Sequence, residues 1–175
     1  MKFLIFPEER QTYNYDCWAK ATQSILNYYG IDVRENIVMK TTKTTKDGTF
    51  MLGIEKVIHD NWLKTTTEKM TVSKIKKYID KKIPVIVVLQ ARTDKIHVNR
   101  KEDRVDGHYV VAIWYDKTKI YFEDPASIFR TYLFFKEFKE RRHDRDSNGK
   151  EYYHYGIAVY GKKPAYNLVK KVHME

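Results

Sequence analysis

The chain has 175 residues, enough for one domain with a sizeable hydrophobic core. Its 33 lysines and arginines against 23 acidic residues give a formal net charge of +10. These positive charges are spread along the whole chain, which favours a solvated lysine-rich surface over a nucleic-acid-binding patch. No apolar stretch approaches the roughly 20 residues that are needed to cross a bilayer. We therefore expect a single domain over residues 1–175 without a membrane span.

The N-terminal segment carries little targeting information. Residues 1–6 are apolar apart from Lys2, but Pro7 interrupts them before they reach the length of a signal-peptide core. We expect a cytoplasmic protein, or a secreted one if a signal peptide has already been removed.

The first half of the chain predicts helices. Residues 3–6 read as a short strand that ends at Pro7. Apolar side chains then recur with helical spacing in three segments. These helices are predicted to begin at Cys17, Thr49 and Thr71. Gly30 is placed to end the first helix, and Asp16 or Asn14 can cap its start.

The second half predicts strands. Ile83–Leu89 is a continuous apolar run rich in β-branched residues, typical of a strand that is covered on both faces. A long charged loop over residues 91–107 follows, and we expect it to border a functional cleft. The later predicted elements are strands at 108–115, 119–123, 129–134 and 153–160 and a helix at 136–142. Helices first and strands after them predict an α+β fold with a largely antiparallel sheet.

Cys17 is the only cysteine of the chain. A lone thiol cannot form an intrachain disulfide or a multi-cysteine metal site, so it is either an inert buried side chain or a reactive nucleophile. At the first turn of a helix, the positive end of the helix dipole favours its thiolate form. The interpretation depends on whether a base and an orienting acid lie nearby.

The predicted hairpin around Asp116 supplies both groups. A turn centred on Asp116 places His108 opposite Asp124, and a two-residue turn shifts the pairing by one residue. A carboxylate there can bind one ring nitrogen of His108 and leave the other for a thiol. The alternative is a surface His–Asp pair without a catalytic role.

Several segments together resemble the C39 family of papain-like cysteine peptidases. They are Gln11 with Asp16-Cys17, Tyr28-Tyr29-Gly30, Asp47-Gly48-Thr49, Gly107-His108-Tyr109-Val110-Val111, Tyr121-Phe122-Glu123-Asp124-Pro125-Ala126 and Glu151 to Gly161. The resemblance implies a papain-like cysteine peptidase fold, with N-terminal helices packed on the sheet. Nothing of an exporter follows, so we expect a free-standing C39-like domain without the ABC exporter of the best-known members.

The resemblance also implies roles for individual residues. Cys17 would be the nucleophile, and His108 the general base and later the acid. Asp124 would orient His108, and Gln11 would donate its side-chain amide to the oxyanion together with the backbone N–H of Cys17. The family commonly has glycine after the cysteine, whereas this chain has Trp18, and the Cys-Trp pair is similar to that of papain.

The function that follows is hydrolysis of a peptide or protein substrate through a Cys-His-Asp triad. Two alternatives stay open: a non-catalytic peptide-binding module on the same fold, and a thiol acyltransferase or transglutaminase-like enzyme, because the same triad serves all acyl transfer. No motif reports the cleavage site or the oligomeric state, and the lack of an exporter leaves recognition of double-glycine leaders undetermined.

No cofactor is required by this chemistry. Asp144, Asp146 and Asn148 match the first half of an EF-hand calcium loop. Tyr155 stands where such a loop needs its bidentate glutamate, so the sequence favours a plain polar turn over a calcium site.

Overall fold

The computed structural model describes residues 4–42, 51–92, 99–145 and 149–174. Within these ranges the chain forms five helices and eight strands. The helices are α1 (Cys17–Tyr28), α2 (Glu35–Thr41), α3 (Met51–Asp60), α4 (Val72–Asp80) and α5 (Phe135–Arg141). The strands are β1 (Lys64–Lys69), β2 (Val85–Gln90), β3 (Gly107–Tyr115), β4 (Lys119–Glu123), β5 (Thr131–Phe134), β6 (His143–Arg145), β7 (Glu151–Tyr153) and β8 (Tyr155–Tyr160).

Six strands form one sheet in the order β1-β8-β2-β3-β4-β5, and each neighbouring pair is antiparallel. Strands β6 and β7 form a separate hairpin. Strand β2 is buried along its whole length, as its uninterrupted apolar sequence predicts. The α+β fold with a largely antiparallel sheet is confirmed.

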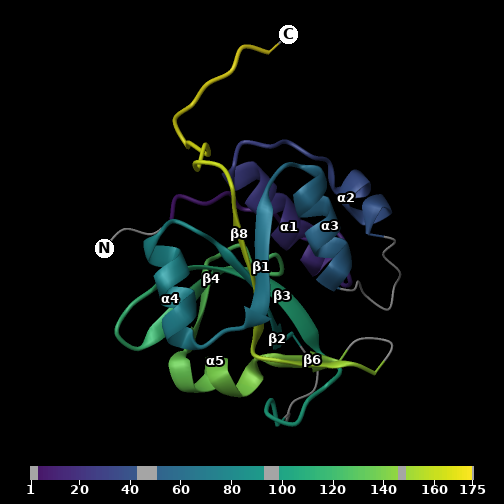
Figure 1. Ribbon diagram of the computed structural model, residues 1–175, viewed down its shortest axis with the longest axis vertical. Helices are drawn as coiled ribbons and strands as arrows, with labels where there is room; N and C mark the ends of the chain where they lie inside the picture. The colour runs from purple at the N-terminus through teal and green to yellow at the C-terminus, as the bar shows by residue number, and fades with distance from the viewer. Residues whose placement is uncertain (1–3, 43–50, 93–98, 146–148, 175) are drawn as a thin grey trace.

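The sheet has helices on both faces (Figure 1). One hydrophobic cluster packs α1, α2 and α3 against side chains such as Val111 and Ile113 of β3. The second packs α4 and α5 against the opposite face, which β3 supplies with Val110 and Ala112. This alternation is the period-two pattern of a strand between two apolar layers.

Helix α1 forms as its apolar period predicts. Trp18, Ala21 and Ile25 are fully buried against the sheet. Gly30 follows the helix at φ +75°, a left-handed conformation that favours glycine. Asp16 occupies the N-cap position, but its side chain does not cap the helix. That carboxyl instead accepts hydrogen bonds from backbone N–H groups upstream.

Helix α4 likewise begins where predicted, because the Thr71 side chain accepts a hydrogen bond from the Lys74 N–H. The predicted start of α3 at Thr49 lies outside the described residues. Elements that were not predicted include α2, in which only Val38 is buried, and β1, a threonine-rich edge strand held by backbone pairing with β8. Strand β6 was not predicted either, because the sequence favoured a polar turn there.

The predicted strand at residues 3–6 is wrong for its described part, because residues 4–10 join no sheet. Side chains from the β4–β5 region hold this segment instead. The Arg130 guanidinium donates to the Phe6 carbonyl, and the Glu9 N–H donates to the Glu123 carboxyl. These contacts are made by individual side chains, so the backbone of residues 4–10 has no neighbouring strand with which to pair.

The predicted register of the β3–β4 hairpin is also wrong. Tyr115 pairs with Ile120, so the turn is longer than predicted, and a bulge between Ala112 and Trp114 shifts the pairing again. The turn closes over four residues because the Asp116 carboxyl accepts the N–H groups of Thr118 and Lys119.

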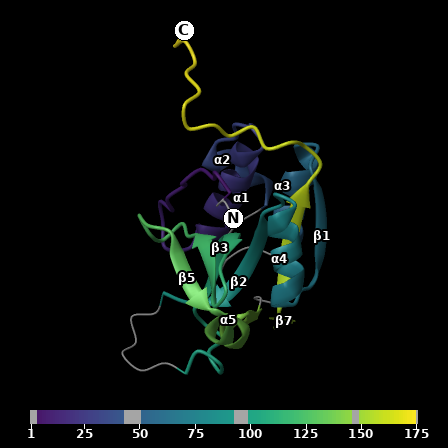
Figure 2. The same cartoon turned by 90° about the vertical axis from the view of Figure 1, so that its left-hand side faces the viewer.

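The C-terminal segment leaves the sheet after β8, passes the end of the helical layer and then extends away from the rest of the molecule (Figures 1 and 2). Its first part is held by two hydrogen bonds, from the N–H groups of Ala165 and Tyr166 to the Tyr28 carbonyl. In the described part of the chain, no helix is both long and apolar enough to span a membrane.

Candidate active site

The loop from Gln11 to Asp16 leads directly into α1 and presents Cys17 at the first helical position. The Asp16 side chain shapes this loop, because its Oδ2 accepts the N–H groups of Thr12 and Tyr13 at 2.9 and 3.0 Å. Cys17 is buried, with 7% of its surface exposed. At this position the first N–H groups of the helix lack helical partners and favour negative charge nearby.

His108 is the second residue of β3 and lies opposite Leu89 of β2. A Cβ on Gly107, the preceding residue, would lie 2.6 Å from a carboxyl oxygen of Asp144, so a larger residue there would require the Asp144 side chain to move. Gln90, which is fully buried, fastens this end of the sheet. Its amide donates to the His143 carbonyl and to Asp144, and its oxygen accepts the Asp106 N–H.

His108 and Asp124 meet as predicted, with 2.7 Å between Nε2 and Oδ1. The shifted register places residue 126 opposite His108, so Asp124 reaches the ring diagonally from the residue after β4. The pairing was therefore right although the predicted turn was wrong. The ring and the carboxyl are both almost fully buried.

Asp124 is surrounded by donors. Its Oδ1 also accepts the Ala126 N–H at 3.0 Å, and its Oδ2 accepts from the Thr131 hydroxyl at 3.1 Å and from the Arg92 guanidinium. Burial acts to raise the pKa of Asp124, but the hydrogen bond from His108 and the charge of Arg92 outweigh it. The pKa of Asp124 therefore lies well below its usual value, and the carboxyl is ionised.

The same contacts set the charge of His108. Burial acts to lower the pKa of His108, but hydrogen bonds with Asp124 and with Cys17 outweigh it and raise the pKa to about 9. The thiol of Cys17 therefore lies close to this ring. At neutral pH the ring therefore carries a proton.

Gln11 lies on the loop next to this pair. Its Nε2 donates to the Tyr13 carbonyl at 2.9 Å, which uses one of the two amide N–H bonds. The backbone N–H of Gln11 donates to the Pro125 carbonyl at 3.0 Å. The loop that carries Gln11 is therefore tied to the segment that directly follows Asp124.

Sequence reasoning missed two side chains that hold Asp124. Arg92 follows β2 with φ +64°, a left-handed conformation that is uncommon for a residue with a side chain. Thr131 opens β5, the next strand beyond β4. Neither residue belongs to a recognisable sequence motif, because it is the pairing of strands in the sheet that brings both of them to Asp124.

A third missed residue is Glu123, which is buried and holds the N-terminal segment through Glu9 and Arg130. Burial raises its pKa to about 7, against the effect of the Glu9 hydrogen bond and the Arg130 charge.

A cavity of about 250 Å³ lies beside the His108–Asp124 pair. Its walls are apolar side chains of the sheet, including Leu89, Val110 and Phe122, and Arg92 and Arg141 also line it.

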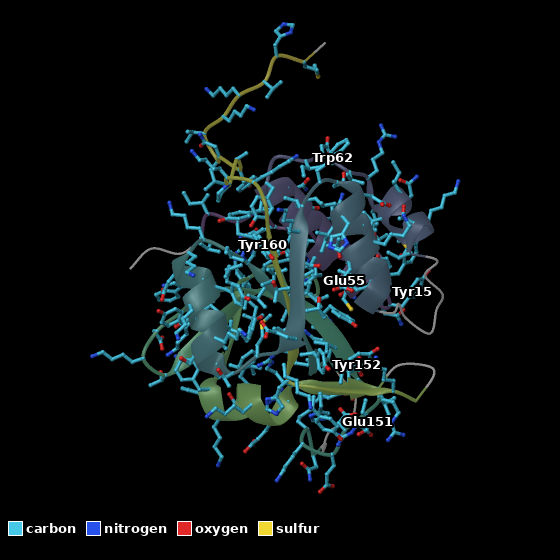
Figure 3. The ribbon with its side chains drawn as sticks, viewed as in Figure 1. Tyr15, Glu55, Trp62, Glu151, Tyr152 and Tyr160 are labelled. Atoms are coloured by element: carbon cyan, nitrogen blue, oxygen red, sulfur yellow. The ribbon has the colours of Figure 1, made fainter. Side chains whose placement is uncertain are left out.

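The described part of the long charged loop, residues 99–106, packs against the β6–β7 hairpin. The His143 ring contacts the Asp103 carbonyl at 2.8 Å, and Arg104 contacts Tyr153 and Glu151. Figure 3 labels Tyr152 and Glu151 of this hairpin on the same side of the view as Tyr15 of the Gln11–Asp16 loop. A border role for the loop at a substrate cleft stays a prediction.

The predicted calcium loop overlaps this hairpin. Asp144 lies in β6 and accepts from Gln90, whereas Asp146 and Asn148 are outside the described residues. In the ranges that the structure describes, no three or more His, Cys, Asp and Glu side chains are grouped to hold a metal ion.

Comparisons with solved structures support the fold. The peptidase domain of Streptococcus ComA, a bifunctional ABC transporter, matches with a TM-score of 0.67 at 19% identity, over 88% of this chain and 97% of that one. A double-glycine-motif protease from an AMS/PCAT transporter, in complex with its leader peptide, gives 0.66 at 17% identity, over 91% and 94%. A candidate C39-like peptidase from Bacillus anthracis gives 0.71 at 14% identity, over 94% and 100%.

A search of the curated proteins found no match. The model of the Peptidase C39 like family, in contrast, matches residues 3–151, which is most of the chain and spans the segments around Cys17, His108 and Asp124. The chain belongs to the Peptidase C39 like family.

Proposed function

We propose that the protein is a cysteine peptidase that hydrolyses peptide bonds with Cys17, His108, Asp124 and Gln11. The observation that carries this proposal is the His108 ring, which is hydrogen-bonded to Asp124 through Nε2 and lies close enough to Cys17 for the thiol to raise its pKa. Family membership supports the same activity. The related protease that was solved with its leader peptide supports a peptide substrate.

In the first half of the reaction, the Cys17 thiolate attacks the carbonyl carbon of the scissile bond. The oxyanion that forms accepts hydrogen bonds from the Cys17 backbone N–H and from the Gln11 amide N–H that Tyr13 does not use. The His108 imidazolium then donates its proton to the leaving nitrogen as the C–N bond breaks. An acyl-thioester on Cys17 and a free amine remain.

In the second half, neutral His108 takes a proton from water as the water oxygen attacks the thioester carbonyl. The C–S bond breaks, the peptide acid leaves, and the thiolate–imidazolium pair is restored. Asp124 holds the ring in one tautomer and stabilises its charge throughout, because it stays ionised.

The decisive experiment compares a mixed peptide library after incubation with the wild type and with Cys17→Ala. Cleavage products should form only with the wild type, and a thiol-directed electrophile should label Cys17 in intact-mass spectra. His108→Ala should slow that labelling at neutral pH, whereas His59→Ala should not, because His59 contacts Thr65 at the surface. Identical product profiles for wild type and Cys17→Ala would leave a non-catalytic binding module.

Gln11→Ala tests the oxyanion site separately. It should lower turnover about 10²–10³-fold, the usual scale for one lost oxyanion donor, with a smaller change in KM. Turnover that is unchanged in this variant would remove Gln11 from the mechanism.

A further inference from the structure

A buried carboxyl pair lies behind the loop that carries Gln11. Asp16, at the end of this loop, lies beside Glu35, the first residue of α2, because Thr12 binds both carboxyls, with its N–H to Asp16 and its hydroxyl to Glu35. Asp16 is fully buried, and the Glu35 side chain is 19% exposed. Two carboxylates in contact away from water repel each other strongly, so such a pair is stable only if one of them carries a proton.

Counting donors and acceptors locates that proton. Asp16 Oδ2 accepts the N–H groups of Thr12 and Tyr13, and Glu35 Oε2 accepts from Lys20 Nζ at 2.9 Å and from the Thr12 hydroxyl at 3.0 Å. The two remaining oxygens, Asp16 Oδ1 and Glu35 Oε1, are buried without a donor. One proton on Asp16 Oδ1, donated to Glu35 Oε1, satisfies both oxygens at once.

The surroundings decide which residue keeps the proton. Lys20 forms an ion pair with Glu35 and favours its ionised form, whereas no ion pair of Asp16 is found in the described ranges. Burial and then the contact with Glu35 raise the pKa of Asp16. Burial acts to raise the pKa of Glu35 as well, but hydrogen bonds from Asp16, Lys20 and Thr12 lower it. The raised pKa of Asp16 and the lowered pKa of Glu35 both place the proton on Asp16.

We propose that protonated Asp16, paired with ionised Glu35 and Lys20, positions the Gln11–Asp16 loop for catalysis. The proposal rests on the peptidase function proposed above. Asp16 is here a positioning residue: it holds the N–H groups of Thr12 and Tyr13, and the carbonyl of Tyr13 in turn holds the Gln11 amide.

The arrangement makes the loop sensitive to high pH. The groups that face the Asp16–Glu35 pair are Thr12 and Tyr13 from the loop and Lys20 from α1. When the shared proton leaves, a second buried negative charge appears and repels Glu35, which loosens the loop against α2. Turnover should therefore fall at alkaline pH, while KM changes less.

Asp16→Asn is the sharpest test, because an asparagine amide can donate to Glu35 while its oxygen accepts from Thr12 and Tyr13. It should keep turnover within about threefold of wild type and lose the part of the alkaline fall that Asp16 causes, while the fall that follows deprotonation of His108, with its pKa of about 9, remains. Asp16→Ala should lower turnover about 10–10²-fold through a misplaced Gln11. Asp60→Asn is the matched control, since Asp60 pairs with Lys56 at the surface. Equal losses in Asp16→Asn and Asp16→Ala would overturn the proposal.

Infrared difference spectra test the pair without any activity. At pH 7.5 the wild type minus Asp16→Asn should show the C=O band of a protonated carboxyl. Glu35→Gln should abolish that band, because its amide can donate to an ionised Asp16. Absence of the band, with cleavage that still depends on Cys17, would overturn this inference alone. Presence of the band without peptide cleavage would overturn the proposed function and leave the proton pair standing.

Discussion

Asp16 and Asp124 are both almost fully buried, with 0% and 4% of their surfaces exposed, yet their pKa values shift in opposite directions. Asp16 precedes Cys17 on the helical side, and Asp124 binds His108 on the sheet side. The pKa of Asp16 is raised and that of Asp124 is lowered. Burial alone therefore does not decide the charge of a carboxyl.

The partners of each carboxyl explain the difference. Asp124 receives hydrogen bonds from an imidazole, a guanidinium, a hydroxyl and a backbone N–H, and two of these groups carry positive charge. Asp16 receives two neutral backbone N–H groups and otherwise meets another acid. Asp124 is therefore held as an anion that stabilises the imidazolium, and Asp16 as a neutral acid that positions the loop.

Replacing each of these two aspartates by asparagine should show the contrast between them most clearly. Asp124→Asn should lower kcat/KM about 10³–10⁴-fold, because the amide favours the wrong tautomer of His108 and cannot stabilise its charge. Asp16→Asn should stay near wild type, so steady-state kinetics of the two variants side by side measure the contrast. Comparable losses at both positions would mean that Asp16 also works as an anion.

The charge of His108 should appear in the stability of the protein. Since the pKa of His108 is raised from 6.5 to about 9, its stabilising contribution is fully present below pH 6.5 and is lost as pH rises through 9. The shift corresponds to about 3 kcal/mol of the free energy of unfolding. Urea unfolding at pH 6 and pH 10 should show this decline in the wild type and a smaller one in His108→Ala.

His59→Ala is the matched control for that measurement and should retain the wild-type decline. An unfolding free energy of His108→Ala that falls as steeply as that of the wild type would assign the decline to other groups. Asp16→Asn removes the shared proton. In the same experiment, the difference between its decline and that of the wild type gives the contribution of the Asp16–Glu35 pair to the free energy of unfolding.

Arg92→Met should have the smallest of these effects. Without the guanidinium the pKa of Asp124 rises towards its usual value, and kcat/KM should fall about tenfold or less. The stability contributed by Asp124 is present above its unfolded pKa of about 3.9 and is lost as pH falls through its lower folded value, so acid unfolding of the variant should begin at higher pH. Arg145→Met, at an exposed pair with Glu151, should match the wild type in both measurements.

Local patterns in the sequence were enough for several features of this site. A helical apolar period after a loop places Cys17 at a helix start, and Thr71 and Gly30 mark helix ends by their own side-chain and backbone chemistry. The proximity of His108 and Asp124 follows from one hairpin, and it survives a turn that was predicted wrongly because diagonal neighbours across two strands stay within reach.

The charge states around the thiol depended on contacts that no local pattern encodes. Arg92 reaches Asp124 from the end of β2, and Thr131 reaches it from β5. Glu35 lies beside Asp16 at the start of α2, a short helix that was not predicted from the sequence. The sequence by itself therefore determined the fold class and which groups could react. Only the tertiary structure decided which carboxyl is ionised, because electrostatic interactions depend on distance in space and on exclusion of water rather than on separation along the chain.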